Sequence, residues 1–172
     1  MRMKRRHRPH QLPAEQDLTR AQQQRCFQIK NLLIDIERVG DMAEDIAGFA
    51  RERIDNRVVF TPAAIEDLQI PGWQAHEICL LAIECFAEDN AGKALRVCRL
   101  ESDFDRLYER TRQAHIRRLE AGGCHPQADV IFTETLRILE RISDHADNLA
   151  VSVSRSLAER QAGRTGRRRT PA

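Results

Sequence analysis

The sequence predicts an all-α protein, an up-down-up-down antiparallel bundle of four helices. Of its 172 residues, 41% are hydrophobic and 31% are charged but only 5% are aromatic, a balance typical of a soluble helical protein with an aliphatic core. Apolar residues recur at three- and four-residue spacing through long stretches, which indicates amphipathic helices. The links between these stretches are short, so consecutive helices are expected to run antiparallel.

The first expected helix runs from about Asp17 to Ile54, a stretch without proline. At 1.5 Å per residue it would be about 55 Å long, which suits a bundle better than a compact globule. Its apolar positions follow the spacing of one helix face: Leu32, Ile36, Val39, Ala43, Ile46 and Ala50.

The second helix is predicted to begin at Thr61 and Pro62, a capping residue followed by a first-turn proline. Pro71 is expected to interrupt it, because proline lacks the backbone N–H that an internal helical position needs. We therefore expect the main body of this helix at 72–88. Its expected core side consists of Trp73, His76, Leu80, Ile83 and Ala87.

A third helix is expected at about 91–121, and Gly122-Gly123 ends it. Pro126 then occupies a first-turn position, and a fourth helix is expected to continue to about Glu159. The first and fourth helices of such a bundle can be antiparallel neighbours.

The chain is expected to form one domain at 16–160 between two disordered basic ends, a lead-in at 1–15 and a tail at 161–172. We expect these ends to be solvated rather than to bind nucleic acid specifically. The longest apolar run, 78–83, is too short to cross a bilayer, and no secretory signal is recognisable. We therefore expect a cytoplasmic protein, peripheral at the inner face of the membrane if it attaches there.

The five cysteines show no Cys-x-x-Cys spacing, so we expect reduced thiols in the core rather than a zinc site.

An internal repeat relates residues 33–47 to residues 136–150. The two copies are identical at the following pairs: Leu33/Leu136, Glu37/Glu140, Arg38/Arg141, Asp41/Asp144, Ala43/Ala146 and Ala47/Ala150. Because each copy lies within a long helix, an antiparallel pairing of the first and fourth helices would place the copies opposite each other by an approximate two-fold relation.

Each copy carries two carboxylates four residues apart, Glu37 with Asp41 and Glu140 with Asp144. Residues at this spacing share a helix face, and like charges there cost about 0.2 to 0.5 kcal/mol per pair. A bound cation would offset the repulsion, and carboxylate oxygens suit magnesium, manganese, iron or zinc. The third helix offers a weaker candidate pair, Glu101 with Asp105. A solvated acidic face is the alternative interpretation.

No catalytic constellation is recognisable in the sequence. It contains no Glu-x-x-His pair at either copy of the repeat, no Gly-rich phosphate loop and no nucleophile elbow. The sequence therefore predicts that the protein is not an enzyme.

The residues of both copies, Glu37-Arg38-Val39-Gly40-Asp41 and Glu140-Arg141-Ile142-Ser143-Asp144-His145, resemble the signature of the PhoU family of phosphate-transport and phosphate-signalling regulators. The resemblance covers about 21–156 and is similar in particular to the PhoU-like cytoplasmic domain of sodium/phosphate cotransporters. It implies repeated three-helix units in which acidic residues hold metal ions. The implied ligands are Glu37, Asp41, Glu140 and Asp144, with Glu101 and Asp105 as a weaker match.

The resemblance also implies a function. We expect a regulatory module that binds a membrane phosphate transporter or an associated sensor. A complete two-repeat PhoU protein would have two further helices ahead of the first copy, so we expect apolar surface on the first helix to be uncovered and to be buried in a homodimer or by a bound partner. The alternatives are a detached cotransporter domain, a metal-dependent enzyme and a purely structural dimerisation bundle.

Overall fold

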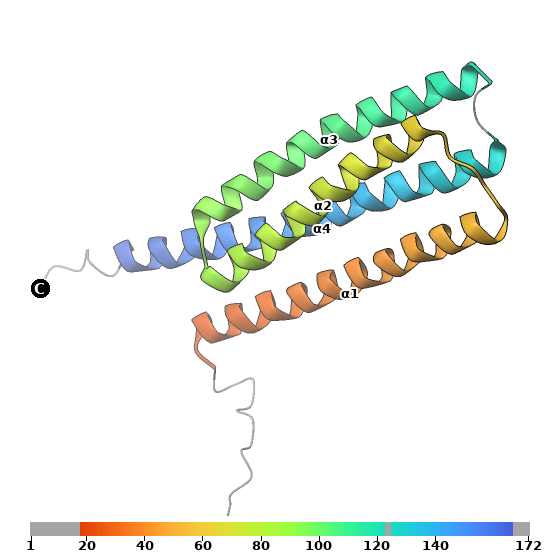
Figure 1. Cartoon of the computed structure of the whole chain (residues 1–172). Coiled ribbons are helices and arrows are strands. Elements are labelled where there is room, and N and C mark those ends of the chain that lie inside the picture. The colour runs from red at the N-terminus through yellow and green to blue at the C-terminus, as the bar shows by residue number, and fades with distance from the viewer. Residues whose placement is uncertain (1–17, 123–124, 167–172) are drawn as a thin grey trace, which may run out of the picture.

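The computed structural model describes residues 18–122 and 125–166, and these residues form four helices without a strand. The helices are α1 (Arg20–Asp55), α2 (Pro62–Glu88), α3 (Ala91–Glu120) and α4 (Pro126–Gly166), and they alternate in direction (Figure 1). The predicted all-α four-helix class is confirmed. The predicted lead-in lies outside the described residues, as do residues 167–172 of the predicted tail, whereas α4 continues through 161–166.

Each of the first three helices begins at a polar residue whose side chain accepts a hydrogen bond from the free N–H groups of the first turn. Thr19 forms a capping box with Gln22, and Thr61 accepts from the backbone of Ala64 just ahead of the first-turn proline. Asn90 accepts from the N–H groups of Gly92 and Lys93. Such caps contribute about 0.5 to 2 kcal/mol each, so these local signals fix the helix starts.

The core lies between α2, α3 and α4, which pack against one another, while α1 packs along α4 (Figure 1). Phe104 of α3 and Val153 of α4 are fully buried there, as is Ile78 of α2. In α1, by contrast, only Gln28 and Met42 are buried. The chain therefore consists of a core of α2, α3 and α4, with α1 packed on one side of it.

The helix α2 runs through Pro71 without interruption, so the predicted break at this residue is wrong. The proline ring is fully buried. Its missing N–H costs one hydrogen bond, and the burial of the ring and of the rest of α2 in the core offsets that cost. Tertiary packing here overrides a local signal.

The predicted core side of α2 is also wrong. Trp73 is 70% exposed, Leu80 is 51% exposed and Ile83 is 48% exposed. The side that faces α3 and α4 instead presents Ala75, Ile78, Leu81, Ala82 and Cys85. Both sides of α2 are apolar, so periodicity could not show which of them the bundle buries.

The link between α1 and α2 is anchored by a second apolar cluster near the start of α4. Val58 and Phe60 are buried there, and the ring of Phe60 lies 6.3 Å from that of Phe132. His115 stacks on Phe132 at 4.0 Å and hydrogen-bonds to Asp129. Within the described ranges, no helix has the length and apolar character that crossing a bilayer requires.

Candidate metal centre

Carboxylates from α3 and α4 meet on one side of the three-helix core. Glu101 and Asp105 lie one turn apart on α3, and Glu140, Asp144 and Asp147 follow one another at four- and three-residue spacing on α4. Residues at this spacing share a helix face. Because α3 and α4 pack against each other, the two acidic faces meet at their contact.

The carboxylates at the centre of this group are Glu101, Asp105 and Asp144. One oxygen atom of each can be chosen so that all three lie within 4.8 Å of one another. Glu101 is half-buried and the two aspartates are exposed, so the group is open to ions from solvent. This separation allows one cation to contact all three side chains after small rotamer changes.

The electrostatics of the group reflect mutual repulsion. Burial raises the pKa of Glu101, and the charges of Asp105, Asp147 and Asp144 raise it further. The pKa of Asp144 is raised by burial and then by Asp105. Glu101 and Asp144 are therefore more costly to ionise in the folded protein than in water.

Glu140 belongs to the same electrostatic group. Burial raises its pKa first, followed by the charges of Asp144 and Asp105, while Arg141 and Arg137 lower it. The cluster is therefore best described as Glu101, Asp105, Glu140 and Asp144, which are two residues from each helix.

Asp147 extends the group toward the interior. Its Oδ1 atom is buried and has no hydrogen-bond partner. Burial, followed by the hydrogen bond and the charge of Asp147, raises the pKa of the neighbouring Cys98 thiol to about 12. Cys98 is therefore protonated at neutral pH and supplies no thiolate ligand.

These residues fit a hard or borderline cation. Their donors are carboxylate oxygens, and a buried oxygen atom lacks a partner. None of the described Lys, Arg or His side chains forms an ion pair with them, because the ion pairs of the described residues use other acids. Magnesium, manganese, iron and zinc all bind such oxygen sets. A cation here would neutralise the repulsion between α3 and α4.

The acidic pair of the first copy lies elsewhere. Glu37 and Asp41 are exposed on α1, and the structure does not bring them into the cluster on α3 and α4. The expected set of Glu37, Asp41, Glu140 and Asp144 is therefore split between two places. The physical reason is that α4 turns Glu140 and Asp144 toward α3 rather than toward α1.

The two copies of the repeat nevertheless lie side by side, as the antiparallel pairing of α1 and α4 predicted. The Nδ1 atom of His145 lies 3.0 Å from the Oδ1 atom of Asp35, which joins the second copy to the first. Further along, Gln24 donates a hydrogen bond of 2.5 Å to Glu159. Contacts from 35 to 145 and from 24 to 159 fix the antiparallel register.

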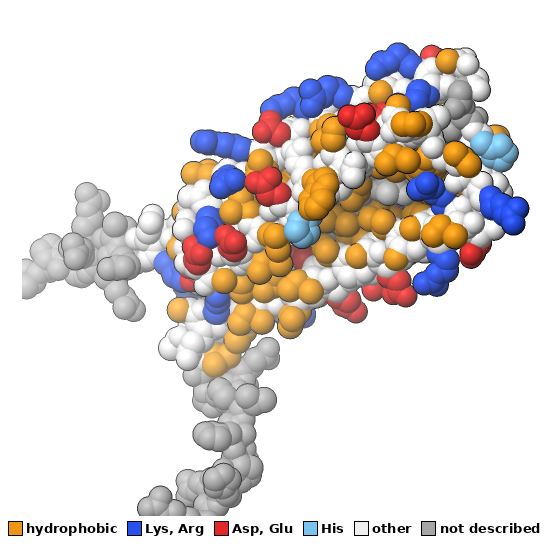
Figure 2. Space-filling view, viewed as in Figure 1, with side chains coloured by type: hydrophobic (Ala, Val, Ile, Leu, Met, Phe, Trp, Pro, Cys, Tyr) orange, Lys and Arg blue, Asp and Glu red, His pale blue; other side chains and the backbone are white. Residues whose placement is uncertain are grey.

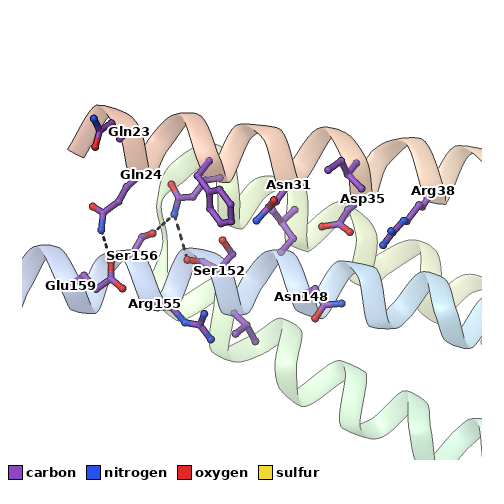
Figure 3. Close-up of a pocket in the computed structure, with 15 residues that line it drawn as sticks. Gln23, Gln24, Asn31, Asp35, Arg38, Asn148, Ser152, Arg155, Ser156 and Glu159 are labelled. Carbon is purple, nitrogen blue, oxygen red and sulfur yellow. Dashed lines mark hydrogen bonds between the residues drawn. The ribbon is translucent and has the colours of Figure 1, made fainter. Parts of the chain in front are cut away.

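A polar groove of about 850 Å³ follows this α1–α4 contact (Figure 3). Gln28 spans it by donating to Ser156 and to the backbone carbonyl of Ser152. Arg38 and Arg155 also line it, and neither forms an ion pair with a residue that the structure describes. None of the described residues that line the groove is a histidine or a cysteine.

The sequence predicted the α3 pair as a weaker candidate than the α1 pair and did not predict Asp147. A signal for Asp147 was present, because it follows Asp144 by three residues and so shares its helix face. The importance of Glu101 and Asp105 depends on which helix packs against the acidic side of α4. Only the tertiary structure shows that this helix is α3.

The PhoU domain family matches residues 72–153, which contain every carboxylate of the cluster. Among curated relatives, a protein of Thermotoga maritima named phosphate-specific transport system accessory protein PhoU homolog 2 is 28% identical over 114 residues, covering 66% of this chain and 47% of that protein. A PhoU homolog of Synechocystis is 28% identical over 148 residues, covering 84% of this chain and 60% of its own length.

The fold is also similar to a solved structure. The crystal structure of PhoU from Pseudomonas aeruginosa superposes with a TM-score of 0.75 at 25% identity, covering 83% of this chain and 68% of that one. The chain spans about half the length of the curated relatives it matches, between 47% and 60% for the two described above. Residues 72–153 are therefore similar to the PhoU domain, and the predicted resemblance to the PhoU family is confirmed.

Proposed function

We propose that this protein is a non-enzymatic regulatory module of phosphate transport, which acts by contact with a membrane phosphate transporter or with a sensor associated with it. The observation that carries the proposal is the similarity of residues 72–153 to the PhoU domain. Its curated relatives are named accessory proteins of phosphate-specific transport systems. An accessory protein needs a surface for its partner, and exposed apolar residues on α1 and α2 support such a role.

The proposal includes a metal ion held between α3 and α4. Glu101, Asp105, Glu140 and Asp144 would supply carboxylate oxygens to a divalent or trivalent ion such as iron, manganese, zinc or magnesium. The ion would supply positive charge. The protein's own part is to keep two acidic helix faces in register, so the charge balance of the cluster controls how firmly α3 is held against α4.

Regulation follows from that balance. Without a counter-charge, repulsion between the acidic faces loosens the contact of α3 with α4. With one, the contact tightens, and binding to the folded state alone stabilises the protein by mass action. The shape presented to a partner would then depend on occupancy of the cluster.

The regulatory role is tested by phosphate uptake in a strain that lacks the gene. We expect uptake to lose its normal dependence on external phosphate and to regain it when the wild-type chain is restored. Solubilised phosphate transporter should be retained by the immobilised protein. Unchanged uptake together with no retention would contradict the proposal.

The metal is tested by calorimetric titration of the chelator-treated protein with manganese and, separately, with zinc. We expect Glu101→Gln and Asp144→Asn to weaken binding by at least about tenfold, because each removes a ligand charge from the central group. Glu37→Gln is the matched control, since Glu37 is exposed on α1 and lies outside the group. Equal affinity in all variants would rule out this centre.

A further inference from the structure

Four exposed arginines form a straight line along the outer side of α3, and we call them the arginine row. Arg99, Arg106, Arg110 and Arg117 follow one another at spacings of seven, four and seven residues. At 3.6 residues per turn, these spacings place the four side chains within about 20° of one direction around the helix axis. Figure 2 shows Lys and Arg side chains along the outer edge of α3. At 1.5 Å per residue the row is about 27 Å long.

The arginine row lies opposite the buried side of α3. Val97, Phe104 and His115 are buried against the other helices, and they fall about 140° to 160° around the helix from the row. Glu101 and Asp105 of the acidic cluster lie about 120° to 160° from the row in the other direction. The row therefore belongs neither to the core nor to the candidate metal centre, and a partner on the row leaves that centre accessible.

Three of the four charges in the row have no counter-charge within the described part of the molecule. Arg106 pairs with Asp103, whereas Arg99, Arg110 and Arg117 form no ion pair with a residue that the structure describes. None of the residues three or four positions from Arg110 is acidic, and one of them is Arg106. Like charges at four-residue spacing repel, and a solvated helix face usually alternates charges of both signs. An anionic partner would offset this repulsion.

Acidic residues border the row on both sides. On the side of α2, the exposed carboxylates are Glu77, Glu84 and Glu88, which pair with basic residues of α3. On the side of α4, Asp105 and Glu109 are exposed. The positive strip is therefore about as wide as one helix, roughly 10 Å. A flat anionic bilayer or a nucleic-acid duplex is wider and would bring its own negative charges against these carboxylates.

The row offers no platform on which nucleobases could stack. The Phe and Tyr residues of α3 are Phe104, which is fully buried, and Tyr108, which packs against the core. Binding of single-stranded nucleic acid combines contacts to the phosphates with stacking on aromatic side chains. A narrow row of arginines without exposed aromatic residues favours a protein element that carries carboxylates.

We propose that the arginine row binds an acidic α-helix of a partner protein, which carries Asp or Glu at the same spacing of seven, four and seven residues. Two helices have the same rise per residue, so such a partner meets every arginine of the row at once. The spacing is the same in both directions, so the partner helix fits in a parallel or an antiparallel orientation. Guanidinium groups bind carboxylates through two N–H···O hydrogen bonds, for which lysine is a poor substitute.

This inference specifies the chemistry of a partner and in that respect rests on the proposed function. The surface itself is testable without the transporter, because a designed peptide can carry the same carboxylates. A negative uptake experiment would contradict the regulatory role, whereas a negative peptide experiment would contradict only the arginine row.

The first experiment measures the fluorescence anisotropy of labelled helical peptides mixed with the full chain, in a chelator so that the metal centre does not contribute. The matched peptide carries four glutamates at the spacing of the row on a background of alanine and glutamine. The comparison peptide has the same composition, with the glutamates distributed around the helix. We expect the matched peptide to bind at least about fivefold more tightly at low salt, because only its charges meet the row together. Equal affinities of the two peptides would overturn the proposal.

The second experiment changes the row. Arg110→Glu combined with Arg117→Glu should weaken binding of the matched peptide by at least about tenfold, because two attractions become repulsions. Arg51→Glu combined with Arg112→Glu is the matched control, since it makes the same change of net charge at exposed positions off the row. Circular dichroism of both double variants should retain the wild-type helix content, because all four side chains are exposed. Equal weakening by the two double variants would show that only net charge matters and would reject the row.

Vesicles of phosphatidylglycerol and phosphatidylcholine test a membrane as the occupant. We expect Arg110→Glu combined with Arg117→Glu to leave co-sedimentation with these vesicles unchanged, because the acidic borders of the row keep a flat anionic surface away. Binding of the wild-type chain to vesicles that this double variant abolishes, together with no preference for the matched peptide, would make the membrane the occupant and overturn the proposal.

Discussion

His145 on α4 hydrogen-bonds to Asp35 on α1 through a 3.0 Å contact between Nδ1 and Oδ1, and this contact joins the two copies of the internal repeat. Both side chains are largely shielded, with 12% and 17% of their surface exposed. Each residue aligns with an apolar residue of the other copy, Asp35 with Ile138 and His145 with Met42. The polar bridge therefore occupies positions where the repeat itself is not conserved between the copies, and it serves the α1–α4 contact.

We predict that Asp35→Ala lowers the free energy of unfolding by about 1 to 2 kcal/mol, because it leaves the shielded His145 nitrogen without its partner. Urea unfolding followed by circular dichroism measures the loss. Asp45→Ala is the control, since Asp45 is exposed and makes no ion pair with a described residue. If both substitutions cost the same, the bridge contributes nothing to the attachment of α1.

The metal-free protein should become more stable as the pH is lowered from about 7 to about 5. The pKa values of Glu101, Glu140 and Asp144 are raised above their usual 4.5, 4.5 and 3.8, chiefly by burial. A raised pKa means that the folded state binds the proton more tightly than the unfolded state. Stability from these groups is therefore fully present below the usual pKa values and is lost as the pH rises through the raised ones.

Thermal unfolding across this pH range in a chelator measures the effect, and Asp144→Asn should flatten the profile because it removes one of the three groups. The opposite contribution of Asp89, whose pKa is lowered by Arg160 and then by Arg25, acts only as the pH falls below its usual 3.8. A melting temperature that falls between pH 7 and pH 5 in the wild-type protein would contradict the prediction.

Phe104→Ala should lower the free energy of unfolding by about 3 to 5 kcal/mol, because the Phe104 ring is fully buried and its removal leaves a cavity between the helices. Leu95→Ala on the same helix is the comparison, since Leu95 is 60% exposed and should cost far less. Guanidinium unfolding of the two variants tests the prediction. Similar midpoints would show that α3 does not pack as described.

Gly48→Ala should raise the free energy of unfolding by about 0.5 to 1 kcal/mol, because alanine loses less conformational entropy than glycine in a helix. A Cβ atom at this position would contact nothing within 4 Å, so no steric cost opposes the gain. Differential scanning calorimetry gives the change in melting temperature. A decrease would mean that something close-packed covers Gly48 in solution.

The sequence predicted the four helices because their signals are local. Thr61 with Pro62 marks a helix start through a hydrogen bond to a residue three positions away, and this cap is present in the structure. The antiparallel contact of the two repeats also followed from sequence, since short links leave few other arrangements. Pro71 is the exception, because its local cost is offset by burial among residues that are distant in sequence.

The acidic pairs themselves were readable from the sequence, since a four-residue spacing fixes which side chains share a helix face. The spacing could not predict which of these acidic pairs meet in the folded protein. Glu140 and Asp144 meet Glu101 and Asp105 because α3 packs on that side of α4, while Glu37 on α1 has no such neighbour. The apolar side of α2 was likewise undetermined, because both of its sides are apolar. Spacing along one helix thus determined which residues act together, whereas only the packing of helices distant in sequence decided which of these faces meet and which remain exposed.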